Sequence, residues 1–410
     1  MRVLVLSATF PSAAEPTRGT FIFERIRRLA ERCDVVVVAP VPWFPFNRWI
    51  RRAQSTLPAM ETVGGLTVYH PRVFSIPRYA KCLDAALYAL CLLPFLARLR
   101  RRFPFDVVDA HFEYPDAVAG TLLGRLLGCP VVVTLRGKLI RAAGYRLHRP
   151  QLRWMLQRAD RVVAVSDYLK RAAEALGIAG SRVRVLRNGV DARRFAPMDQ
   201  VEARRICGLP ADRPILLTVA GLEAHKGQHT VVEALPELLR QHPDLLYVLV
   251  GAGHKGDSFA RDLRATVERL GLGEHVRFVG TRPHAELRPW FCAADLFVLL
   301  TKSEGWPNVI LESLACGLPV VATRVGGVPE IAREGLDGLL VPYQDVPAFR
   351  DAVRKGLAAD WDRTEIVRYA HSLDWNEVVD GAFEELSAAV STAASTKEST
   401  KASKGLRRHA

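Results

Sequence analysis

Short apolar runs alternate with amphipathic stretches along almost the whole chain. The runs have the length of buried strands, and the stretches between them repeat apolar residues at helical spacing. In the first half we expect strands at residues 2–6, 35–39, 107–110, 131–135, 162–165 and 183–186. In the second half we expect them at residues 215–220, 245–250, 276–279, 295–300, 319–322 and 338–341. This alternation predicts an α/β fold with a parallel sheet in each half.

The chain of 410 residues is long enough for two domains. Asn188-Gly189 is a turn signal, and the stretch from there to Asp212 has little periodicity, so it reads as a linker. We expect a first domain, a second domain, a closing helix and a disordered tail, over residues 1–190, 191–370, 371–387 and 388–410. The tail is assigned to disorder because Ser, Thr, Ala and Lys dominate it.

The stretch 303–323 is the one around which the second half is organised. It lies between two apolar runs, Pro307 suits the first turn of a helix, and Gly317 with Pro319 would end that helix. A strand–loop–helix–strand unit places the loop at the carboxyl edge of a parallel sheet, where ligands bind. The start of the helix, at 308–310, would offer backbone N–H groups and a positive dipole end to a phosphate.

Two carboxylates, Glu304 and Glu312, frame this expected anion site. A carboxylate accepts two hydrogen bonds at once, so we expect both to bind sugar or ribose hydroxyls and not phosphate. The simpler alternative is that Glu304 stabilises the helix dipole and Glu312 occupies a solvated helix position.

Composition and charge narrow the class of protein. Apolar residues make up 49% of the chain and charged residues 24%, as in an ordinary globular protein. Seven Cys without a C-x-x-C pair argue against a disulfide framework and a zinc site, and favour a reducing cytoplasm. The amino terminus lacks the pattern of a signal peptide. Residues 1–195 hold 32 Lys and Arg against 14 Asp and Glu, a charge of +18 within a total of +14.

The amino-acid sequence of the 303–323 stretch resembles the motif of a known family. Glu304 and Glu312 with seven residues between them are followed by Ala-Cys-Gly-Leu-Pro-Val-Val-Ala at 315–322 and Gly-Gly-Val-Pro-Glu-Ile at 326–331. This is similar to the signature of retaining GT-B glycosyltransferases of family 4. The resemblance implies two Rossmann-like, doubly wound domains facing across a cleft, with the nucleotide sugar on the second domain and the acceptor on the basic first domain.

The resemblance also assigns roles to individual residues. Lys226 would neutralise the diphosphate of the donor, His111 in His-x-x-x-Pro-Asp would face the donor sugar, and Glu304 would address that sugar. These three are the expected catalytic residues. The expected donor-binding residues are Gly19, Gly221, Lys226, Gly251, Arg282, Glu304, Gly305, Trp306, Pro307, Asn308, Val309, Ile310 and Glu312. The expected acceptor-binding residues are Arg18, His111, Arg136 and Lys138.

Two departures from the family pattern stand out, and a third motif needs a separate reading. Many relatives have Arg at the position of Gly221, so a second phosphate-binding cation is missing or is supplied by Arg282 or Arg288. Many have His-Gly where this chain has Arg136-Gly137-Lys138, which puts the acceptor side in question. The G-x-G-x-x-G pattern at 251–256 follows a strand, but no acidic residue ends the next strand, so it is not read as a dinucleotide fingerprint.

We therefore expect a metal-independent, retaining hexosyltransferase that uses a nucleotide sugar, with a UDP-sugar as the default, in cell-surface polysaccharide or glycolipid synthesis. No further cofactor, metal or nucleic acid is expected. The alternatives are a nucleotide-sugar hydrolase or epimerase, and a non-catalytic nucleotide-binding membrane scaffold.

The basic half also predicts where the protein works. Aromatic and Arg residues at 43–52 and the apolar run 85–97, which ends in Arg98, Arg100, Arg101 and Arg102, suit an anionic membrane surface. The run is too short to span a bilayer, and a core helix is the alternative. We expect peripheral binding at the cytoplasmic face of the membrane and a glycan or lipid-linked acceptor.

Overall fold

The structure is a computed structural model that describes residues 1–45, 57–75, 80–253 and 258–406. The chain forms two compact units, Met1–Arg187 with Trp375–Ala410, and Asn188–Asp374. The first boundary lies close to the expected one at residue 190. The second unit ends at Asp374 and not at residue 370, and the last segment of the chain belongs to the first unit.

The first unit is built on an eight-stranded sheet with the order β10-β9-β8-β7-β1-β2-β5-β4. β4 runs antiparallel to β5, and the other neighbours are parallel. The strands of this sheet, and those of a separate parallel pair β3-β6, are β1 (Arg2–Leu6), β2 (Asp34–Val38), β3 (Val41–Trp43), β4 (Met60–Val63), β5 (Leu66–Tyr69), β6 (Arg72–Phe74), β7 (Val107–His111), β8 (Val131–Leu135), β9 (Arg161–Ala164) and β10 (Val183–Val185).

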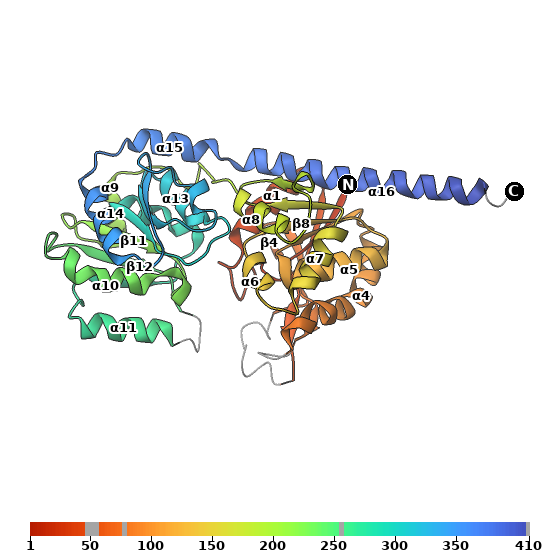
Figure 1. The fold of residues 1–410 in the computed structure, drawn as a ribbon, viewed down its shortest axis with the longest axis horizontal. Coiled ribbons are helices and arrows are strands. Elements are labelled where there is room, and N and C mark those ends of the chain that lie inside the picture. Colours follow the sequence, from red (N-terminus) through yellow and green to blue (C-terminus); the bar gives the residue numbers. More distant parts are fainter. Residues whose placement is uncertain (46–56, 76–79, 254–257, 407–410) are drawn as a thin grey trace. The chain divides into compact units, whose positions relative to one another are not determined.

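Helices cover this sheet, with α1 against α16 and α5 against α4 and α7 (Figure 1). The helical elements of the unit are α1 (Thr20–Leu29), η1 (Lys81–Leu83), α4 (Asp84–Arg102), η2 (Glu113–Ala117), α5 (Val118–Leu127), α6 (Leu139–Ala143), α7 (Arg149–Arg158), α8 (Asp167–Glu174), η3 (Gly180–Arg182) and α16 (Trp375–Leu406). Within the described residues, the η1–α4 stretch passes the length and hydropathy test for a membrane-crossing helix, and 39% of it is buried. Tyr88, Leu92 and Leu96 pack into the unit, as expected for a core helix.

The second unit holds a six-stranded sheet with the order β13-β12-β11-β14-β15-β16, in which every neighbouring pair is parallel. Its strands are β11 (Ile215–Val219), β12 (Leu246–Val250), β13 (Val276–Gly280), β14 (Leu296–Leu299), β15 (Val320–Thr323) and β16 (Gly338–Val341). The order reverses between β11 and β14, as in dinucleotide-binding folds, and the carboxyl ends of these two strands flank the usual ligand position.

Helices lie on both faces of the second sheet. α10 packs against α11 and α14, and α12 contacts α9 and α13. The helical elements are α9 (Gln200–Cys207), η4 (Ala224–Lys226), α10 (Gln228–Leu238), α11 (Phe259–Arg269), η5 (His284–Glu286), α12 (Arg288–Ala293), α13 (Asn308–Ala315), η6 (Val328–Glu330), α14 (Val346–Ala358) and α15 (Arg363–Ser372). Helices on both faces leave strands such as β11 buried along their whole length.

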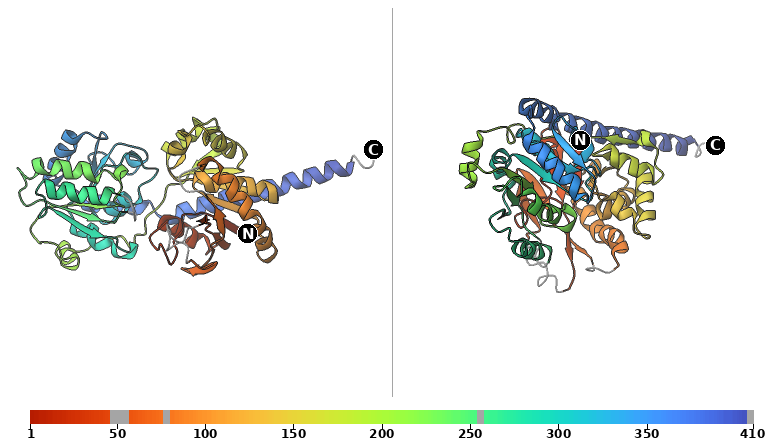
Figure 2. Two further views of the ribbon diagram at one scale, coloured as in Figure 1. Left: turned by 90° about the horizontal axis from the view of Figure 1, so that it is seen from below. Right: turned by 60° about the vertical axis from the view of Figure 1, so that its left-hand side comes forward.

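The expected disorder of residues 388–410 is wrong up to Leu406, because α16 continues to that residue. Its first turns bury Trp375, Val379 and Leu386 in the core of the first unit. Figure 2 shows α16 as a long blue helix that leads to the C-terminus. Further along, the hydroxyls of Thr392 and Thr396 donate to carbonyls one turn back, at 2.8 and 2.9 Å. These bonds keep the hydroxyls within the helix, and the Ala residues between them are strong helix formers.

Two stretches expected to be irregular contain regular structure. Residues 40–60 include β3, and the linker up to Asp212 includes α9. Strands of three residues carry too little periodicity to be recognised, and α9 is placed by its packing on α12. The expected membrane segment 43–52 falls mostly on residues 46–52, which lie outside the described residues.

Candidate active site

The candidate donor site lies at the carboxyl ends of β11 and β14 in the second unit. Lys226, on η4 after β11, donates to Glu304 Oε1 at 2.6 Å. Thr301, directly after β14, donates its hydroxyl to the same oxygen at 3.2 Å. The ammonium and the carboxylate are both largely buried, with side chains 23% and 15% exposed. Two residues that are 78 positions apart therefore form one charged pair at the switch point of the sheet.

The neighbouring glycines make this close approach possible. Gly227, at φ +78°, lies so close to β14 that a Cβ there would come 2.0 Å from the Leu300 carbonyl oxygen. A Cβ on Gly326 would come 1.9 Å from the Glu304 carbonyl oxygen, which also accepts the N–H of Gly327 at 3.0 Å. The Gly-Gly pair of the motif is thus required to seat Glu304.

The helix that follows, α13, starts as the sequence predicts. Pro307 is the residue before its first turn, and no side chain of the described residues caps that turn. The first N–H groups of a helix have no intrahelical acceptor, so this end suits an anion. Within the turn, the N–H of Ile310 donates to the Pro307 carbonyl, and the Ile310 side chain is fully buried. Asn308 and Val309 are partly exposed and head the helix.

Glu312 is held on one side only. The side chain of His284 donates from Nε2 to Glu312 Oε1 at 2.8 Å, while Arg194 donates to His284 Nδ1 at 3.1 Å. Because Arg has only donors, His284 Nδ1 accepts, which leaves the hydrogen on Nε2 for Glu312. Glu312 Oε2 is buried and has no hydrogen-bond partner among the described residues. The carboxylate is therefore fixed by one oxygen and can accept a ligand hydroxyl with the other.

Sequence reasoning missed His284 and Arg194. Their local sequence pattern does not predict the contact with Glu312, because η5 and α13 come together only in the folded unit. The ring of Phe195 packs edge-on against His284, with the centroids 5.1 Å apart, and supports this orientation.

The other expected donor residues of the second unit take different positions. Trp306 is 6% exposed and donates to the Asn188 carbonyl at 3.1 Å, so it anchors the Gly305-Trp306-Pro307 loop. The Asn188 side chain donates to Asn308 Oδ1 at 3.1 Å. Gly305 and Pro307 are buried with Trp306. This loop thus presents backbone more than side chains.

Gly221 and Gly251 belong to two neighbouring βα turns. The Gln228 amide donates to the Gly221 carbonyl at 2.8 Å. At Gly251, φ is +143°, and a Cβ would come 1.9 Å from the carbonyl oxygen of Ala220. Close packing of the two turns explains the glycine at 251. The remainder of the G-x-G-x-x-G pattern, from 254, lies outside the described residues.

The second cation of the family is not replaced by Arg288. Its guanidinium donates to the carbonyls of Ala196 and Pro197 at 2.8 and 2.7 Å, which holds it within the unit. Arg282 is exposed and lies 6.0 Å from the centre of the Trp290 ring. Of the two candidates, Arg282 is the one whose guanidinium reaches solvent.

In the first unit, His111 ends β7 and is completely buried. Arg136 donates to His111 Nδ1 at 3.0 Å, so His111 carries its hydrogen on Nε2, which contacts Asp109 Oδ2 at 3.1 Å. Arg25 donates to the same Asp109 oxygen at 3.3 Å and to Thr134 at 3.0 Å. Both ring nitrogens of His111 are thus engaged inside the protein. This corrects the expectation that His111 faces a substrate.

Electrostatics agree with a neutral His111. Burial lowers its pKa to about 4 against the raising effect of Asp109, and Arg136 lowers it further. Burial by itself raises the pKa of Asp109, but His111 and Arg25 hold it well below the usual range. The network is therefore an anionic Asp109 flanked by cations and a neutral imidazole.

Glu113 joins two loops at this edge, which the sequence did not indicate. Its carboxylate is fully buried and accepts the backbone N–H groups of Arg136, Gly137 and Lys138 at 2.8, 3.1 and 3.1 Å. Arg136 is itself 7% exposed, whereas Lys138 is exposed, with its ammonium 4.5 Å from the centre of the Phe112 ring. Of the three expected acceptor residues His111, Arg136 and Lys138, Lys138 is the exposed one.

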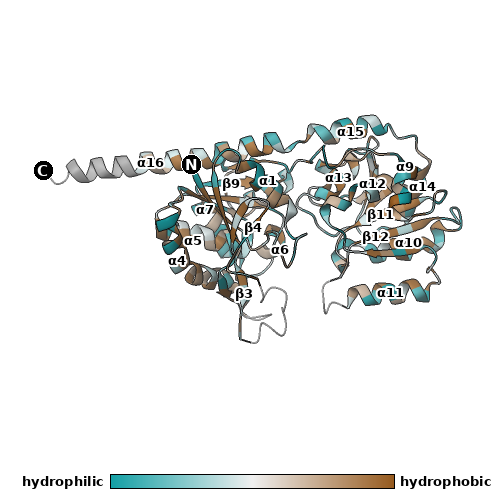
Figure 3. Cartoon of the chain, turned by 180° about the vertical axis from the view of Figure 1, so that it is seen from behind, coloured by the Kyte–Doolittle hydropathy of each residue, from teal (hydrophilic) through white to brown (hydrophobic). Residues whose placement is uncertain are grey.

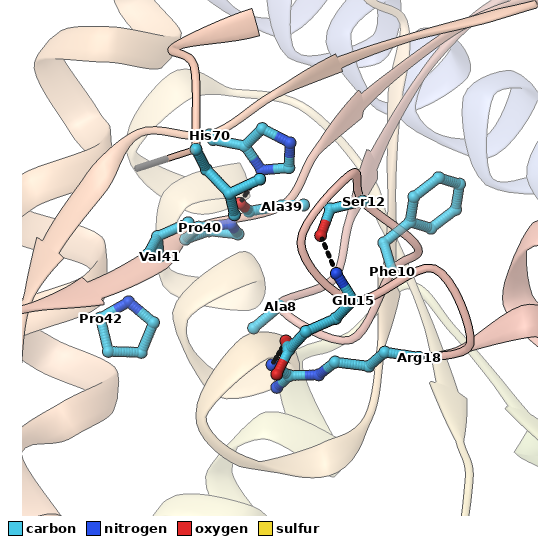
Figure 4. A pocket seen from close by; sticks show the side chains of 11 residues that line it. Ala8, Phe10, Ser12, Glu15, Arg18, Ala39, Pro40, Val41, Pro42 and His70 are labelled. Carbon is cyan, nitrogen blue, oxygen red and sulfur yellow. Dashed lines mark hydrogen bonds and ion pairs between the residues drawn. The ribbon is translucent and has the colours of Figure 1, made fainter. Parts of the chain in front are cut away.

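A small hollow lies beside Arg18, at the ends of β1, β2 and β5 (Figure 4). Arg18 pairs with Glu15 at 2.7 Å, and both line the hollow together with Ser12 and His70. Gly19 begins α1 at φ +71°, where a Cβ would come 2.5 Å from the carbonyl oxygen of Thr9. The hollow and Gly19 belong to the loop after β1, where the family resemblance expects substrate.

Asp116 ties this loop to the end of β7. It is 3% exposed and accepts the N–H of Ala8 at 2.6 Å. Burial raises its pKa to about 6. Among the residues that the structure describes, no group of three His, Cys, Asp or Glu is placed to hold a metal ion.

Comparison with known proteins agrees with this geometry. A family model described as "Glycosyltransferase Family 4" matches residues 18–194, and one described as "Glycosyl transferases group 1" matches residues 199–372. D-inositol 3-phosphate glycosyltransferase 1 of Catenulispora acidiphila is 30% identical over 409 residues, covering 92% of this chain and 94% of the relative. The putative teichuronic acid biosynthesis glycosyltransferase TuaC of Bacillus subtilis is 28% identical over 398 residues, covering 95% and 94%.

Solved structures show the same fold. HepE of Anabaena, in complex with UDP and glucose, matches with a TM-score of 0.72 at 20% identity and covers 95% of this chain and 100% of its own. A sucrose-phosphate synthase of Thermosynechococcus elongatus matches with a TM-score of 0.71 at 21% identity, covering 98% and 99%. The protein therefore has the GT-B fold. It belongs to the family 4, group 1 glycosyltransferases, enzymes that use nucleotide-sugar donors.

Proposed function

We propose that the protein transfers a hexose from a UDP-sugar to a hydroxyl of a glycan or lipid-linked acceptor, with retention of anomeric configuration and without a metal ion. The observation that carries this proposal is the arrangement around α13. The second unit holds a buried carboxylate, and one of its oxygens has no hydrogen-bond partner among the described residues. The same unit provides a Lys and a helix start without a side-chain cap. Together they match the ribose and diphosphate of a nucleotide sugar.

The two carboxylates, Glu312 and Glu304, bind different parts of the donor. Glu312, oriented by His284, accepts a ribose hydroxyl through Oε2. Lys226, now paired with Glu304, exchanges that partner for a diphosphate oxygen when the donor enters. The exchange releases Glu304 toward the hydroxyls of the sugar. Charge on the leaving diphosphate grows in the transition state, so Lys226 and the start of α13 stabilise that state more than the bound donor.

Support for the donor and the acceptor comes from similar proteins. HepE is solved with UDP and with UDP-glucose, which favours a UDP-sugar, whereas a relative from Mycolicibacterium smegmatis, 35% identical over 254 residues, is GDP-mannose-dependent. The names of the relatives mention D-inositol 3-phosphate in one case and teichuronic acid biosynthesis in another. We place the acceptor on the first unit, where Lys138 and the Arg18 loop reach solvent.

The decisive experiment measures nucleotide release from UDP-, GDP- and ADP-sugars, with and without an acceptor. Transfer predicts release that depends on an added acceptor such as inositol phosphate or a diphosphate-linked lipid sugar, and the anomeric coupling in the product reports retention. Release without acceptor indicates a hydrolase. Conversion of the donor sugar without release indicates an epimerase. Donor binding without turnover indicates a non-catalytic scaffold, and each of these three results contradicts the proposal.

A further inference from the structure

The outward face of α4 is apolar. Leu83 and Leu90 are 52% and 69% exposed, while Tyr88 and Leu92 on the opposite face are buried against the unit. Ala86, Pro94 and Ala97 continue the exposed face along the helix. In Figure 3 the helix is brown over these turns and teal at its arginine-rich end. The stripe therefore combines two exposed leucines with three smaller apolar residues, and contiguous apolar surface of this kind can mark an interaction site.

A second apolar surface adjoins α4. In the α6–α7 segment Ile140, Tyr145 and Leu147 are 41%, 53% and 61% exposed. The side chain of Gln151 on α7 donates to the carbonyl of Cys82 at 2.9 Å, which holds this segment against the start of α4. Leu126, at the end of α5, is 60% exposed. Six of the eleven exposed large apolar side chains in the described part of the chain therefore belong to the η1–α4 stretch, α5 and the α6–α7 segment.

The charged residues of these segments are mostly basic. Residues 117–159 contain no Asp or Glu and eight Lys or Arg. The exposed ones of the α6–α7 segment include Arg141, Arg146 and Arg149. The one acid of α4, Asp84, is 8% exposed and bonds to Lys81 and Ser75. Exposed basic residues at the other end of α4 are Arg98, Arg101 and Arg102.

We propose that this face, made of the outer side of α4 and the α6–α7 segment, docks on the surface of an anionic phospholipid bilayer. Apolar side chains enter the headgroup boundary while Arg residues around them bind lipid phosphates. The lack of Asp and Glu in residues 117–159 favours lipid, because an anionic surface attracts the Arg residues of this segment. A second copy of the chain would instead set Arg against Arg. Anionic lipids line the cytoplasmic leaflet, which makes that leaflet the expected location.

Flotation with vesicles tests the proposal. The full chain should float with vesicles of phosphatidylcholine and phosphatidylglycerol at low salt, and should stay behind with vesicles of phosphatidylcholine alone. It should dissociate at about 1 M salt, where the Debye length falls to about 3 Å. No flotation with the anionic vesicles, or equal flotation with both, overturns the proposal.

Paired variants locate the surface. Leu90→Ser with Leu147→Ser should lower the affinity for anionic vesicles by about tenfold or more. The matched control is Val201→Ser with Ile206→Ser, which removes two apolar side chains of α9 that are 68% and 52% exposed. All four side chains are exposed, so the substitutions should leave folding intact. An equal loss in both pairs contradicts the proposal.

The charges are tested separately. Arg141→Ser, Arg146→Ser and Arg149→Ser combined should lower affinity on the order of 100-fold, since each basic residue near an anionic surface contributes about fivefold. Arg261→Ser and Arg205→Ser in the second unit serve as the control. Sedimentation gives the remaining outcome: a dimer that the Leu90 and Leu147 substitutions dissociate assigns the face to a second copy and overturns the membrane assignment. None of these readouts depends on which sugar is transferred.

Discussion

The carboxyl ends of the parallel strands carry charged and polar side chains in both units, but these side chains have different partners. At the edge of the second unit, Lys226 and Glu304 remain partly exposed, and Glu312 keeps one oxygen without a partner among the described residues. At the edge of the first unit, His111 and Arg136 bond to each other inside the protein. One edge is thus prepared for a ligand that supplies hydroxyls and phosphates. The other is closed by its own charges.

The comparison indicates how the two halves serve the reaction. The nucleotide part of a donor is the same in every reaction cycle, so it can be bound by a fixed set of side chains. In the second unit we expect these to be Lys226 and Glu312. In the first unit the buried network fixes the loops after β7 and β8, so that Lys138 and the Arg18 loop are the groups left to contact an acceptor. We propose that the network shapes this surface and does not itself contact the substrates.

The largest effect is expected at the open edge. Lys226→Ala should lower kcat by about 100- to 1,000-fold with a smaller change in donor affinity, because leaving-group charge grows in the transition state. Steady-state kinetics and the dissociation constant for UDP separate the two. Lys302→Ala, a neighbouring exposed Lys, is the control. A variant that loses only affinity would contradict the role given to Lys226.

The buried network of the first unit should make folding stability depend on pH. Because the pKa of His111 is lowered to about 4, the unfolded chain binds more protons between about pH 4 and 6.5, and stability falls as pH drops through that window. The integrated loss is on the order of 3 kcal/mol. Asp116, whose pKa is raised to about 6, acts in the opposite direction between about pH 4 and 6.

The titration of His111 by NMR separates the two groups. Its ring resonances should titrate near pH 4, and His111→Gln should reduce the acid-induced loss of stability, whereas His242→Gln in the second unit should not. A normal titration of His111 near pH 6.5 would mean that the ring is solvated and that the first edge is open after all.

A moderate effect is expected for Glu312. Glu312→Ala removes charge-assisted hydrogen bonds worth roughly 1.5–3 kcal/mol, so UDP should bind about 10- to 100-fold more weakly in calorimetry. His284→Ala should give a smaller loss, since it frees the orientation of the carboxylate but keeps its charge. The exposed Glu268 on α11 provides the control Glu268→Ala. Unchanged UDP affinity in the Glu312 variant would refute the ribose assignment.

The smallest effect is expected from chelation. If Lys226 and the start of α13 together stabilise the leaving diphosphate, transfer should proceed at an unchanged rate in EDTA. The measurement is the initial rate before and after chelation, then with Mg²⁺ or Mn²⁺ restored. Loss of activity that either ion restores would show that the open edge works through a metal.

Much of the local structure follows from sequence. The apolar runs predict β1 and β8 to the residue, and α8 begins at a local cap, where Ser166 accepts the N–H of Leu169 at 3.3 Å. The 303–323 stretch predicts α13 and its Pro307 start. These features depend on neighbours within a few positions, where side-chain spacing, proline and capping decide the backbone.

Long-range contacts decided the rest. Nothing local distinguishes a His that faces a substrate from His111, whose partner Arg136 is 25 positions away. The contact of His284 with Glu312 spans 28 positions. Helix α16 follows the second unit in sequence, yet its Trp375 is buried in the core of the first unit. The sequence determined which groups stand at the sheet edges, because strand ends are local. Only tertiary structure decided which of those groups stay open, because burial and pairing depend on chain segments brought together by folding.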